Sequence, residues 1–377
     1  MSNFFTDLFG PKQSESVLGI DIGSSSIKLV QITRKNGHAV LETYGELALG
    51  PYAGKSVGEA TNLPVEKIIE AIKDLINEKE VKVTTRLCGV AIPFASSLMT
   101  VIEMPALEPK QLAPMIPIEA RKYIPVPISE VTLDWSIIPK DRNPDTDKTN
   151  MENQEKDGKP MIPKSEVLIV ALHNDTIERY KTIVGKSTLN ASFFEIEIFG
   201  TMRAVLDNET TPVLIIDMGA TTTKLYIVER GILRLSHMIN RGGQNITNEL
   251  SKLLGISIND AEVIKRDKGI LGVANGIGLK DVITVTLDYI FSEANHFLLS
   301  YQKKYNKNIS KVILVGGGSS LKGISDVAKK SFQTEVSAGD PFQKVIAPAF
   351  LEKILRDTGP EFTVAVGVAL RRIQELD

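Results

Sequence analysis

The chain has 377 residues, of which 42% are hydrophobic, and this length normally corresponds to two or more domains that each bury a core. Its formal net charge of −2 argues against a nucleic-acid partner, because binding to phosphate backbones normally requires a basic face. A single cysteine excludes an intramolecular disulfide, and scattered histidines without cysteine neighbours argue against a zinc site.

The chain also lacks the marks of a secreted or membrane-spanning protein. No apolar run reaches the roughly eighteen residues of a membrane span, and no signal peptide opens the chain, so we expect a soluble cytoplasmic protein. The first ten residues place Phe4, Phe5, Leu8 and Phe9 at helical spacing. This pattern favours a loosely docked terminus, and contact with a membrane or a partner is the alternative.

A strand–turn–strand sequence occurs twice in the chain. VLGIDIGSSSIKLVQITR, residues 17–34, aligns without gaps to VLIIDMGATTTKLYIVER, residues 213–230, with 8 of 18 positions identical. The matches include an Asp, a Gly and a Lys in register, which two unrelated amphipathic hairpins would not be expected to share. We therefore expect two related halves that present the same turn to something between them.

The composition of these turns is typical of a phosphate site. Glycine lets backbone N–H groups approach an anion closely, and the hydroxyl residues add further donors. The carboxylates Asp21 and Asp217 would repel a bare phosphate, so we expect them to hold a hydrated Mg²⁺ through water. The predicted cradles consist of Gly23, Ser24, Ser25, Ser26 and Lys28 in the first turn, and Gly219, Ala220, Thr221 and Thr222 in the second.

Residues 97–190 are expected to form an inserted small α/β unit. SLMTVIEMP, EVTLDWSIIP and SEVLIVALHN have the character of strands, EPKQLAPMIPIEARKYI is mostly helical, and DTIERYKTIVGKS is an amphipathic helix. Pro114 and Pro117 should start or kink the first helix. Residues 141–160 are nearly devoid of hydrophobic residues, which predicts a flexible surface loop.

A third glycine cluster lies near the end of the chain. KVILVGGGSSLKGI, residues 311–324, is an apolar strand followed by a triple glycine and the start of a predicted helix. Alone, this pattern also fits a tight turn of any α/β fold. Beside the two repeated turns, it favours a third wall of the same site, with Gly316, Gly317, Gly318, Ser319 and Lys322 as its candidate residues.

These three motifs resemble the two phosphate motifs and the adenosine motif of the actin/Hsp70/sugar-kinase superfamily. The resemblance implies an α/β protein of two lobes, each with a ribonuclease-H-like core, that binds ATP and Mg²⁺ in the cleft between them. Residues 242–266 further resemble the second lobe of the cell-division protein FtsA, which implies that Gly243, Glu262 and Lys265 contact the nucleotide. FEIEIFG resembles the first interlobe connection and makes Glu197, with Asp21 and Asp217, a candidate to position a metal or water. VAVGVALRRI resembles the second connection.

The stretch IPIEARKYIPVPISEVTLDW, residues 116–135, resembles PilM-type proteins, the actin-like components of type IV pilus assembly. PilM-type proteins share the inserted, FtsA-type subdomain in lobe 1. The resemblance implies a partner, the short cytoplasmic N-terminus of a PilN-type inner-membrane protein, bound as an extended peptide. Candidate contacts are Arg121, Tyr123, Ile124, Leu133 and Trp135, although Ile124 and Leu133 are better explained as core residues of the unit.

The resemblance also predicts where the parts of the fold begin and end. We expect the lobe 1 core at 14–96, the insert at 97–190, and the interlobe connection with a lobe 1 helix at 191–211. Lobe 2 should cover 212–345, with a smaller insert of its own at about 240–305. The second connection should return to lobe 1 over 346–377.

Three functions fit these motifs. The first is a nucleotide-binding scaffold peripheral to the inner membrane, with pilus motor ATPases, a platform protein or further copies of the chain as additional partners. An FtsA-like division ATPase is the second, but the chain stops at RRIQELD, where FtsA-type chains add a basic amphipathic helix. A small-molecule kinase is the third, but no acidic motif suits its base. Lys224 replaces the aspartate of Hsp70-type loops, and Ala220 and Thr221 replace glycines, so we expect at most slow ATP hydrolysis.

Overall fold

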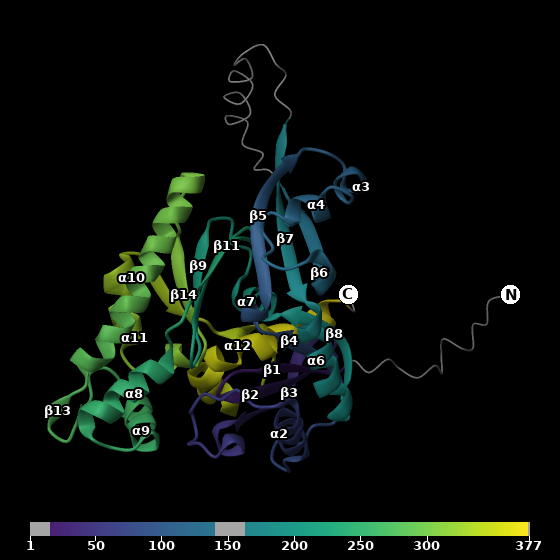
Figure 1. The fold of residues 1–377 in the computed structure, drawn as a ribbon. Helices are drawn as coiled ribbons and strands as arrows, with labels where there is room; N and C mark the ends of the chain where they lie inside the picture. The colour runs from purple at the N-terminus through teal and green to yellow at the C-terminus, as the bar shows by residue number, and fades with distance from the viewer. Residues whose placement is uncertain (1–15, 140–162, 376–377) are drawn as a thin grey trace.

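The structure of the protein, a computed structural model, describes residues 16–139 and 163–375. The N-terminal aromatic segment and the loop predicted at 141–160 therefore lie outside the described residues. Two α/β lobes stand side by side, and the inserted unit extends from the first lobe along the flank of the second (Figure 1). Among the described residues, no helix is both long enough and apolar enough to cross a bilayer.

The first lobe is built on a five-stranded sheet in the order β3-β2-β1-β4-β8. The hairpin strand β1 pairs antiparallel with β2 and parallel with β4, and β4 pairs parallel with β8. Helices α2 and α6 cover one face and α12 covers the other, because each presents a stripe of buried aliphatic residues to the sheet. The strands are β1 (Ser16–Ile22), β2 (Ser26–Lys35), β3 (His38–Ala48), β4 (Leu87–Ile92) and β8 (Asn190–Ile196), and the helices are α2 (Val65–Asn77), α6 (Asn174–Lys186) and α12 (Glu352–Gln374).

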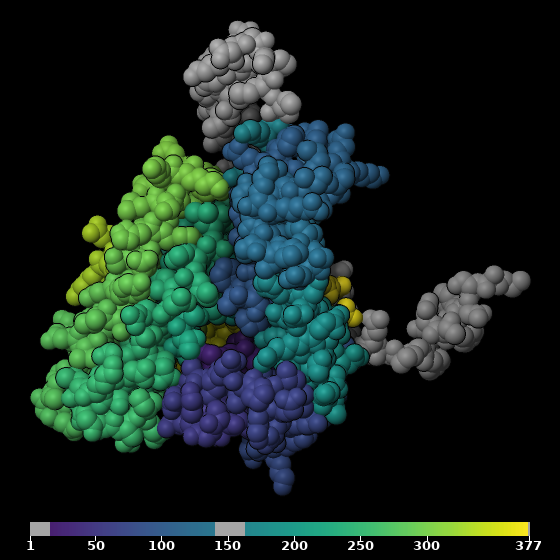
Figure 2. All heavy atoms as spheres, in the orientation of Figure 1, coloured from purple at the N-terminus to yellow at the C-terminus, as the bar shows by residue number. Residues whose placement is uncertain are grey.

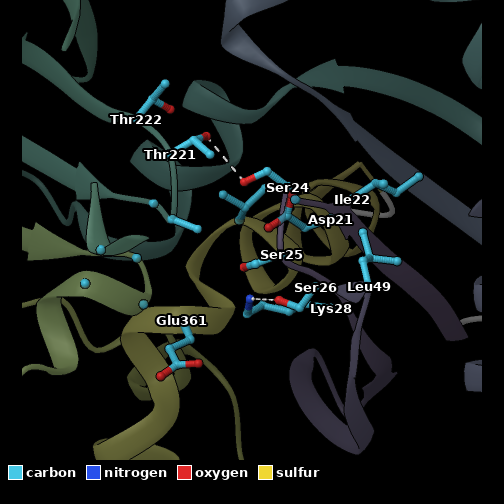
Figure 3. A pocket seen from close by; sticks show the side chains of 18 of the residues that line it. Asp21, Ile22, Ser24, Ser25, Ser26, Lys28, Leu49, Thr221, Thr222 and Glu361 are labelled. Carbon is cyan, nitrogen blue, oxygen red and sulfur yellow. Dashed lines mark hydrogen bonds between the residues drawn. The ribbon is translucent and has the colours of Figure 1, made fainter. Parts of the chain in front are cut away.

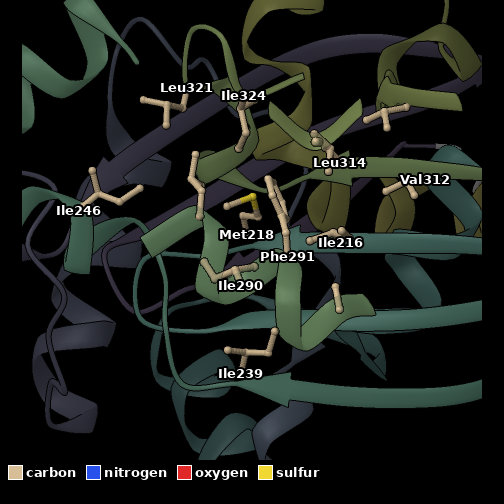
Figure 4. Packing of buried hydrophobic residues seen from close by; sticks show 14 of the residues in the cluster. Ile216, Met218, Ile239, Ile246, Ile290, Phe291, Val312, Leu314, Leu321 and Ile324 are labelled. Carbon is tan, nitrogen blue, oxygen red and sulfur yellow. The ribbon is translucent and has the colours of Figure 1, made fainter. Parts of the chain in front are cut away.

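The second lobe repeats this arrangement with the strand order β11-β10-β9-β14-β15. Its hairpin β9–β10 occupies the place of β1–β2, so the sequence repeat is a structural repeat and the predicted two-lobed fold is confirmed. The core lies between this sheet and the long helix α10, where Phe291 packs against strand residues such as Ile216 and Leu314 (Figure 4). The strands are β9 (Val213–Met218), β10 (Thr223–Glu229), β11 (Ile232–Ile239), β14 (Lys311–Val315) and β15 (Glu335–Ala338). The remaining elements of this lobe are α8 (Gly243–Leu254), α9 (Ile258–Lys268), β12 (Val273–Ala274), β13 (Ile277–Gly278), α10 (Lys280–Tyr305) and α11 (Ile324–Phe332).

Two helices join the lobes and cross with their backbones in contact. Helix α7 (Glu197–Val205) follows β8 out of the first lobe, and α12 returns to it. A Cβ atom on Gly367 of α12 would stand 1.8 Å from the carbonyl oxygen of Gly200 in α7, so only glycine fits at this crossing. The glycine pair therefore sets the distance between the two connecting helices.

The inserted unit is a three-stranded antiparallel sheet in the order β5-β7-β6. Two short helices cover one face of it, in place of one predicted helical stretch, because Pro114 falls between them and Pro117 lies in the first turn of the second. The other face packs against α7 and the second lobe through a shared cluster that includes Leu168 and Tyr226. The elements are β5 (Ser97–Pro105), α3 (Pro109–Leu112), α4 (Ile116–Ala120), β6 (Val131–Ile138) and β7 (Lys164–His173).

Helix α6 belongs by its packing to the first lobe, although the expected insert boundary at residue 190 placed it in the inserted unit. Its buried residues Tyr180, Ile183 and Val184 join the core cluster of the first sheet. Short 3-10 helices complete the described chain at Gly50–Ala53, Phe94–Ser96, Ile128–Glu130, Gly317–Ser320, Pro341–Lys344 and Ala349–Leu351.

Candidate functional site

A cavity of about 730 Å³ lies between the two lobes. The space-filling view shows the surface hollowed where the green second lobe meets the purple first lobe, with yellow α12 visible at the bottom (Figure 2). Its volume falls within the usual range for a small-molecule or cofactor site. The predicted site residues that line it are Asp21, Gly23, Ser24, Ser25, Ser26, Lys28, Glu197, Asp217, Gly219, Ala220, Thr221, Thr222, Gly243, Glu262, Lys265, Gly316, Gly317 and Gly318.

The two repeated turns have the same local geometry and meet across the cavity. In the first turn the Gly23 N–H donates to the carbonyl oxygen of Ser26 at 3.0 Å, and in the second the Gly219 N–H donates to that of Thr222 at 2.9 Å. The Ser24 and Thr221 hydroxyl oxygens lie 3.4 Å apart (Figure 3). The two tips thus bring their small residues and hydroxyl groups to the same space, where turns of this composition can bind an anion.

The carboxylates expected at the centre of the cleft are gathered there, but a lysine lies among them. Lys224 Nζ donates to Glu197 Oε2 at 2.7 Å and lies 3.3 Å from Asp217 Oδ2. Burial disfavours the Lys224 ammonium, but the neighbouring charges of Asp217 and Glu197 outweigh it and raise the pKa of Lys224. Burial, and then the charge of Glu197, raises the pKa of Asp21 to about 6.

Glu197 is therefore poorly placed to activate a water molecule. Its second oxygen, Oε1, accepts the backbone N–H of Phe94 at 2.6 Å, so both oxygens are hydrogen-bonded. An oxygen that already accepts a hydrogen bond from an ammonium or an amide is not free to accept a proton from water.

The expected Mg²⁺ fits these residues poorly. Asp217, one of its two predicted water-mediated ligands, is paired with Lys224. Within residues 16–139 and 163–375, no group of three or more His, Cys, Asp or Glu side chains is arranged to hold a metal ion. The pair with Lys224 therefore leaves Asp217 poorly suited to hold a metal together with Asp21.

The second lobe closes one end of the cavity with the predicted pair Glu262 and Lys265. Lys265 Nζ donates to Glu262 Oε2 at 2.6 Å, and the Thr247 hydroxyl donates to the same oxygen at 2.6 Å. Burial lowers the pKa of Lys265 although Glu262 opposes this shift. Helix α8 starts at the tip of the second hairpin, where the Gly243 N–H donates to the Gly219 carbonyl oxygen at 3.0 Å.

The triple glycine forms the third wall, as expected, but two of its predicted neighbours do not line the cavity. Gly316 has a φ of +80°, and a Cβ atom there would lie 2.5 Å from Asp217 Oδ1, so the turn needs glycine for both conformation and space. The Ser319 hydroxyl is buried and donates to the Gly316 carbonyl oxygen at 2.7 Å. Lys322 points outward and donates to the Asp267 carbonyl oxygen at 2.6 Å.

Several lining residues were not predicted from the sequence. One of them is Glu46 on β3, whose Oε1 lies 3.1 Å from the Nζ of the predicted residue Lys28. Lys28 also donates to Ser26 Oγ at 2.7 Å. Glu361 on α12 enters the cavity on the side of Lys28 (Figure 3). Further lining residues that the motifs did not indicate are Gln244, Arg266 and Ser320. Gln244, Arg266 and Ser320 lie within stretches that the motifs cover, whereas Glu46 and Glu361 lie outside them and reach the cavity through the packing of β3 and α12.

Comparison with known proteins decides the family. The sequence model of the family described as "Type IV pilus assembly protein PilM" matches residues 19–373. The chain belongs to the PilM family. It is also 24% identical over 362 residues to the cell division protein FtsA of Neisseria meningitidis serogroup B, a match that covers 88% of this chain and 85% of the relative.

Solved structures support the same fold. The structure described as "PilM-PilN type IV pilus biogenesis complex" superposes with a TM-score of 0.76 at 22% identity and covers 96% of this chain and 99% of that chain. MreB 5 of Spiroplasma citri bound to AMPPNP superposes with a TM-score of 0.51 at 11% identity, over 97% of this chain and 98% of that one. The fold of this PilM-family chain is thus that of the actin-like ATPases.

The candidate partner residues of this PilM-family chain fall into two groups in the inserted unit. Ile124 is 6% exposed and belongs to the core beneath α3 and α4, whereas Tyr123 is 44% exposed and Arg121 is exposed. Leu133 and Trp135 are half-buried on β6, where they pack against the same core. The strand β6 lies at an edge of the sheet. Binding of a partner peptide through Tyr123 and Trp135 stays a prediction.

Proposed function

We propose that this PilM-family chain is a nucleotide-binding scaffold of type IV pilus assembly that binds ATP between its lobes. The observation that carries this proposal is the meeting of two identically closed hairpin tips over a cavity of about 730 Å³. Backbone amides from both lobes can hold a polyphosphate there, and the wall near Glu262 and Lys265 can hold the nucleoside.

We further propose that the inserted unit binds the cytoplasmic N-terminal peptide of a PilN-type membrane protein at the cytoplasmic face of the inner membrane. Three observations support this step. The strand β6 lies at an edge of the described part of the sheet, where a further strand can pair with it. The inserted unit also carries the half-buried Trp135 on β6 and the exposed Tyr123 after α4. The solved relative is itself a PilM–PilN complex.

Hydrolysis is proposed to be slow at most, because Glu197 is held by Lys224 and by the Phe94 amide. A hydrogen bond also joins the two lobes across the cleft. The Ala60 N–H of the first lobe donates to Gln244 Oε1 of the second at 2.9 Å.

Calorimetric titration tests both binding proposals. ATP is titrated first, and a synthetic peptide with the sequence of the partner's cytoplasmic tail is titrated second, onto the wild type and onto Tyr123→Ala. We expect both ligands to bind the wild type and the variant to lose peptide affinity but not ATP affinity. Absence of peptide binding, together with phosphate transfer stimulated by a metabolite, would favour a kinase and contradict the scaffold.

A further inference from the structure

The two halves of the repeat each place a lysine beside an aspartate on neighbouring strands. In the first hairpin Lys28 is the register partner of Asp21, and in the second Lys224 is the register partner of Asp217. By sequence and by strand register the two lysines are equivalent. Their side chains nevertheless have different partners.

Lys28 stays within its own sheet, where it contacts Ser26 at 2.7 Å and Glu46 at 3.1 Å. Lys224 instead crosses to the connecting helix α7 and contacts Glu197 at 2.7 Å, while it lies 3.3 Å from Asp217. Only 14% of the Lys224 side chain is exposed, and Glu197 and Asp217 are 8% and 7% exposed. The ammonium is thus enclosed between a carboxylate of the second lobe and a carboxylate of the connecting helix α7, and all three side chains line the cavity.

We propose that the Lys224 ammonium takes the place of a divalent cation in this cleft, so that the chain binds a nucleoside triphosphate without magnesium. This inference rests on the proposed function, ATP binding between the lobes. Mg²⁺ is held by oxygen ligands at about 2.0–2.1 Å, either directly or through waters that carboxylates bind. Here one oxygen of Glu197 and one oxygen of Asp217 accept from the lysine instead. Two cations a few ångströms apart in a site shielded from water repel each other strongly, so the site has room for one of them.

The test compares ATP affinity in magnesium with ATP affinity in EDTA. For the wild type we expect dissociation constants that agree within about threefold. For Lys224→Gln, which frees Glu197 and Asp217 for a metal, we expect affinity in EDTA to be about tenfold or more weaker than in magnesium. Lys28→Gln is the matched control from the other hairpin. It should weaken ATP affinity in magnesium and in EDTA by the same factor, so that the ratio of the two dissociation constants stays that of the wild type.

Binding of Mn²⁺ alone gives a second readout that needs no nucleotide. The electron paramagnetic resonance signal of free Mn²⁺ should persist when the wild type is added and should decrease with Lys224→Gln. If circular dichroism shows that Lys224→Gln does not fold, the test uses the wild type and Lys224→Arg. For each, the dissociation constant of ATP in EDTA is compared with that in magnesium. Lys224→Arg keeps the positive charge and should retain magnesium-independent binding.

The outcomes separate this inference from the proposed function. Wild-type affinity for ATP that falls tenfold or more in EDTA, or stoichiometric Mn²⁺ binding by the wild type, overturns the inference and leaves ATP binding intact. No ATP binding in either condition overturns the proposed function, and the inference with it.

Discussion

The glycine crossing of the two connecting helices offers a sharp test of the fold. In Gly367→Ala the new Cβ would lie 1.8 Å from the carbonyl oxygen of Gly200 and 2.4 Å from its carbonyl carbon. No rotamer change can relieve a contact between a Cβ and a backbone, so α7 and α12 must move apart. Overpacking of this kind costs about 1–3 kcal/mol and occasionally more. The helix propensity of alanine returns about 1 kcal/mol, so we expect a net loss of up to about 2 kcal/mol, and a larger one only if the overpacking exceeds its usual range.

Gly185→Ala is the matched control, because Gly185 also lies within a helix but a Cβ atom there meets nothing within 4 Å. This variant should gain about 0.5–1 kcal/mol from helix propensity alone. Urea unfolding followed by far-ultraviolet circular dichroism measures both changes, and the fluorescence of Trp135 in the inserted unit provides a second probe. If Gly367→Ala unfolds at the same urea concentration as the wild type, the backbone contact does not set the helix spacing.

Three further predictions follow from single side chains. Lys28→Ala should lower ATP affinity by about tenfold or more, and with it the protection of the fold by ATP against heat, because a charge-assisted hydrogen bond contributes about 1.5–3 kcal/mol. The exposed Lys181→Ala on α6 is its control, and equal protection of the two variants would mean that Lys28 does not contact the nucleotide. The pKa of Asp21 is about 6 in the folded chain, and its ordinary value is 3.8. The folded state therefore favours the protonated carboxyl, and the stability that this carboxyl retains below pH 3.8 is lost as the pH rises through 6. Asp21→Asn should therefore raise the free energy of unfolding by up to about 3 kcal/mol at pH 7.5 and by little near pH 4, and urea titrations that give the same gain at both pH values would refute this. Glu166→Ala should destabilise by about 1–3 kcal/mol, because Glu166 on β7 accepts hydrogen bonds at 3.0 Å from Arg234 and from Tyr305 of the second lobe. Glu103→Ala removes an exposed pair with Lys164 in the same sheet and should change unfolding by no more than about 1 kcal/mol in the same urea assay, so equal effects would exclude a special role for Glu166.

The repeat of the hairpin sequence predicted two related halves, and the family resemblance of its motifs predicted the two-lobed fold. Strand periodicity and the turn residues are local properties, and the copied positions appear in both sheets at the same place in the strand order. The triple glycine was predicted for the same reason, since Gly316 adopts a positive φ that its own residue type favours. The two prolines likewise marked where a helical stretch divides into α3 and α4.

The partners of the charged residues depended on tertiary structure. Lys28 and Lys224 occupy the same position of the repeat, yet one pairs with Glu46 in its own sheet and the other with Glu197 on a connecting helix. Glu361 enters the cleft because the second connecting helix returns beside the triple glycine, where the Gly316 N–H donates to the Pro360 carbonyl oxygen at 2.8 Å. The hydrogen bonds that close a turn join residues that are neighbours along the chain. The sequence by itself therefore determined the two turns of the phosphate site. The pairing of charges depends on which side chains packing brings within a few ångströms, so only the folded chain decided which cation lies between the lobes.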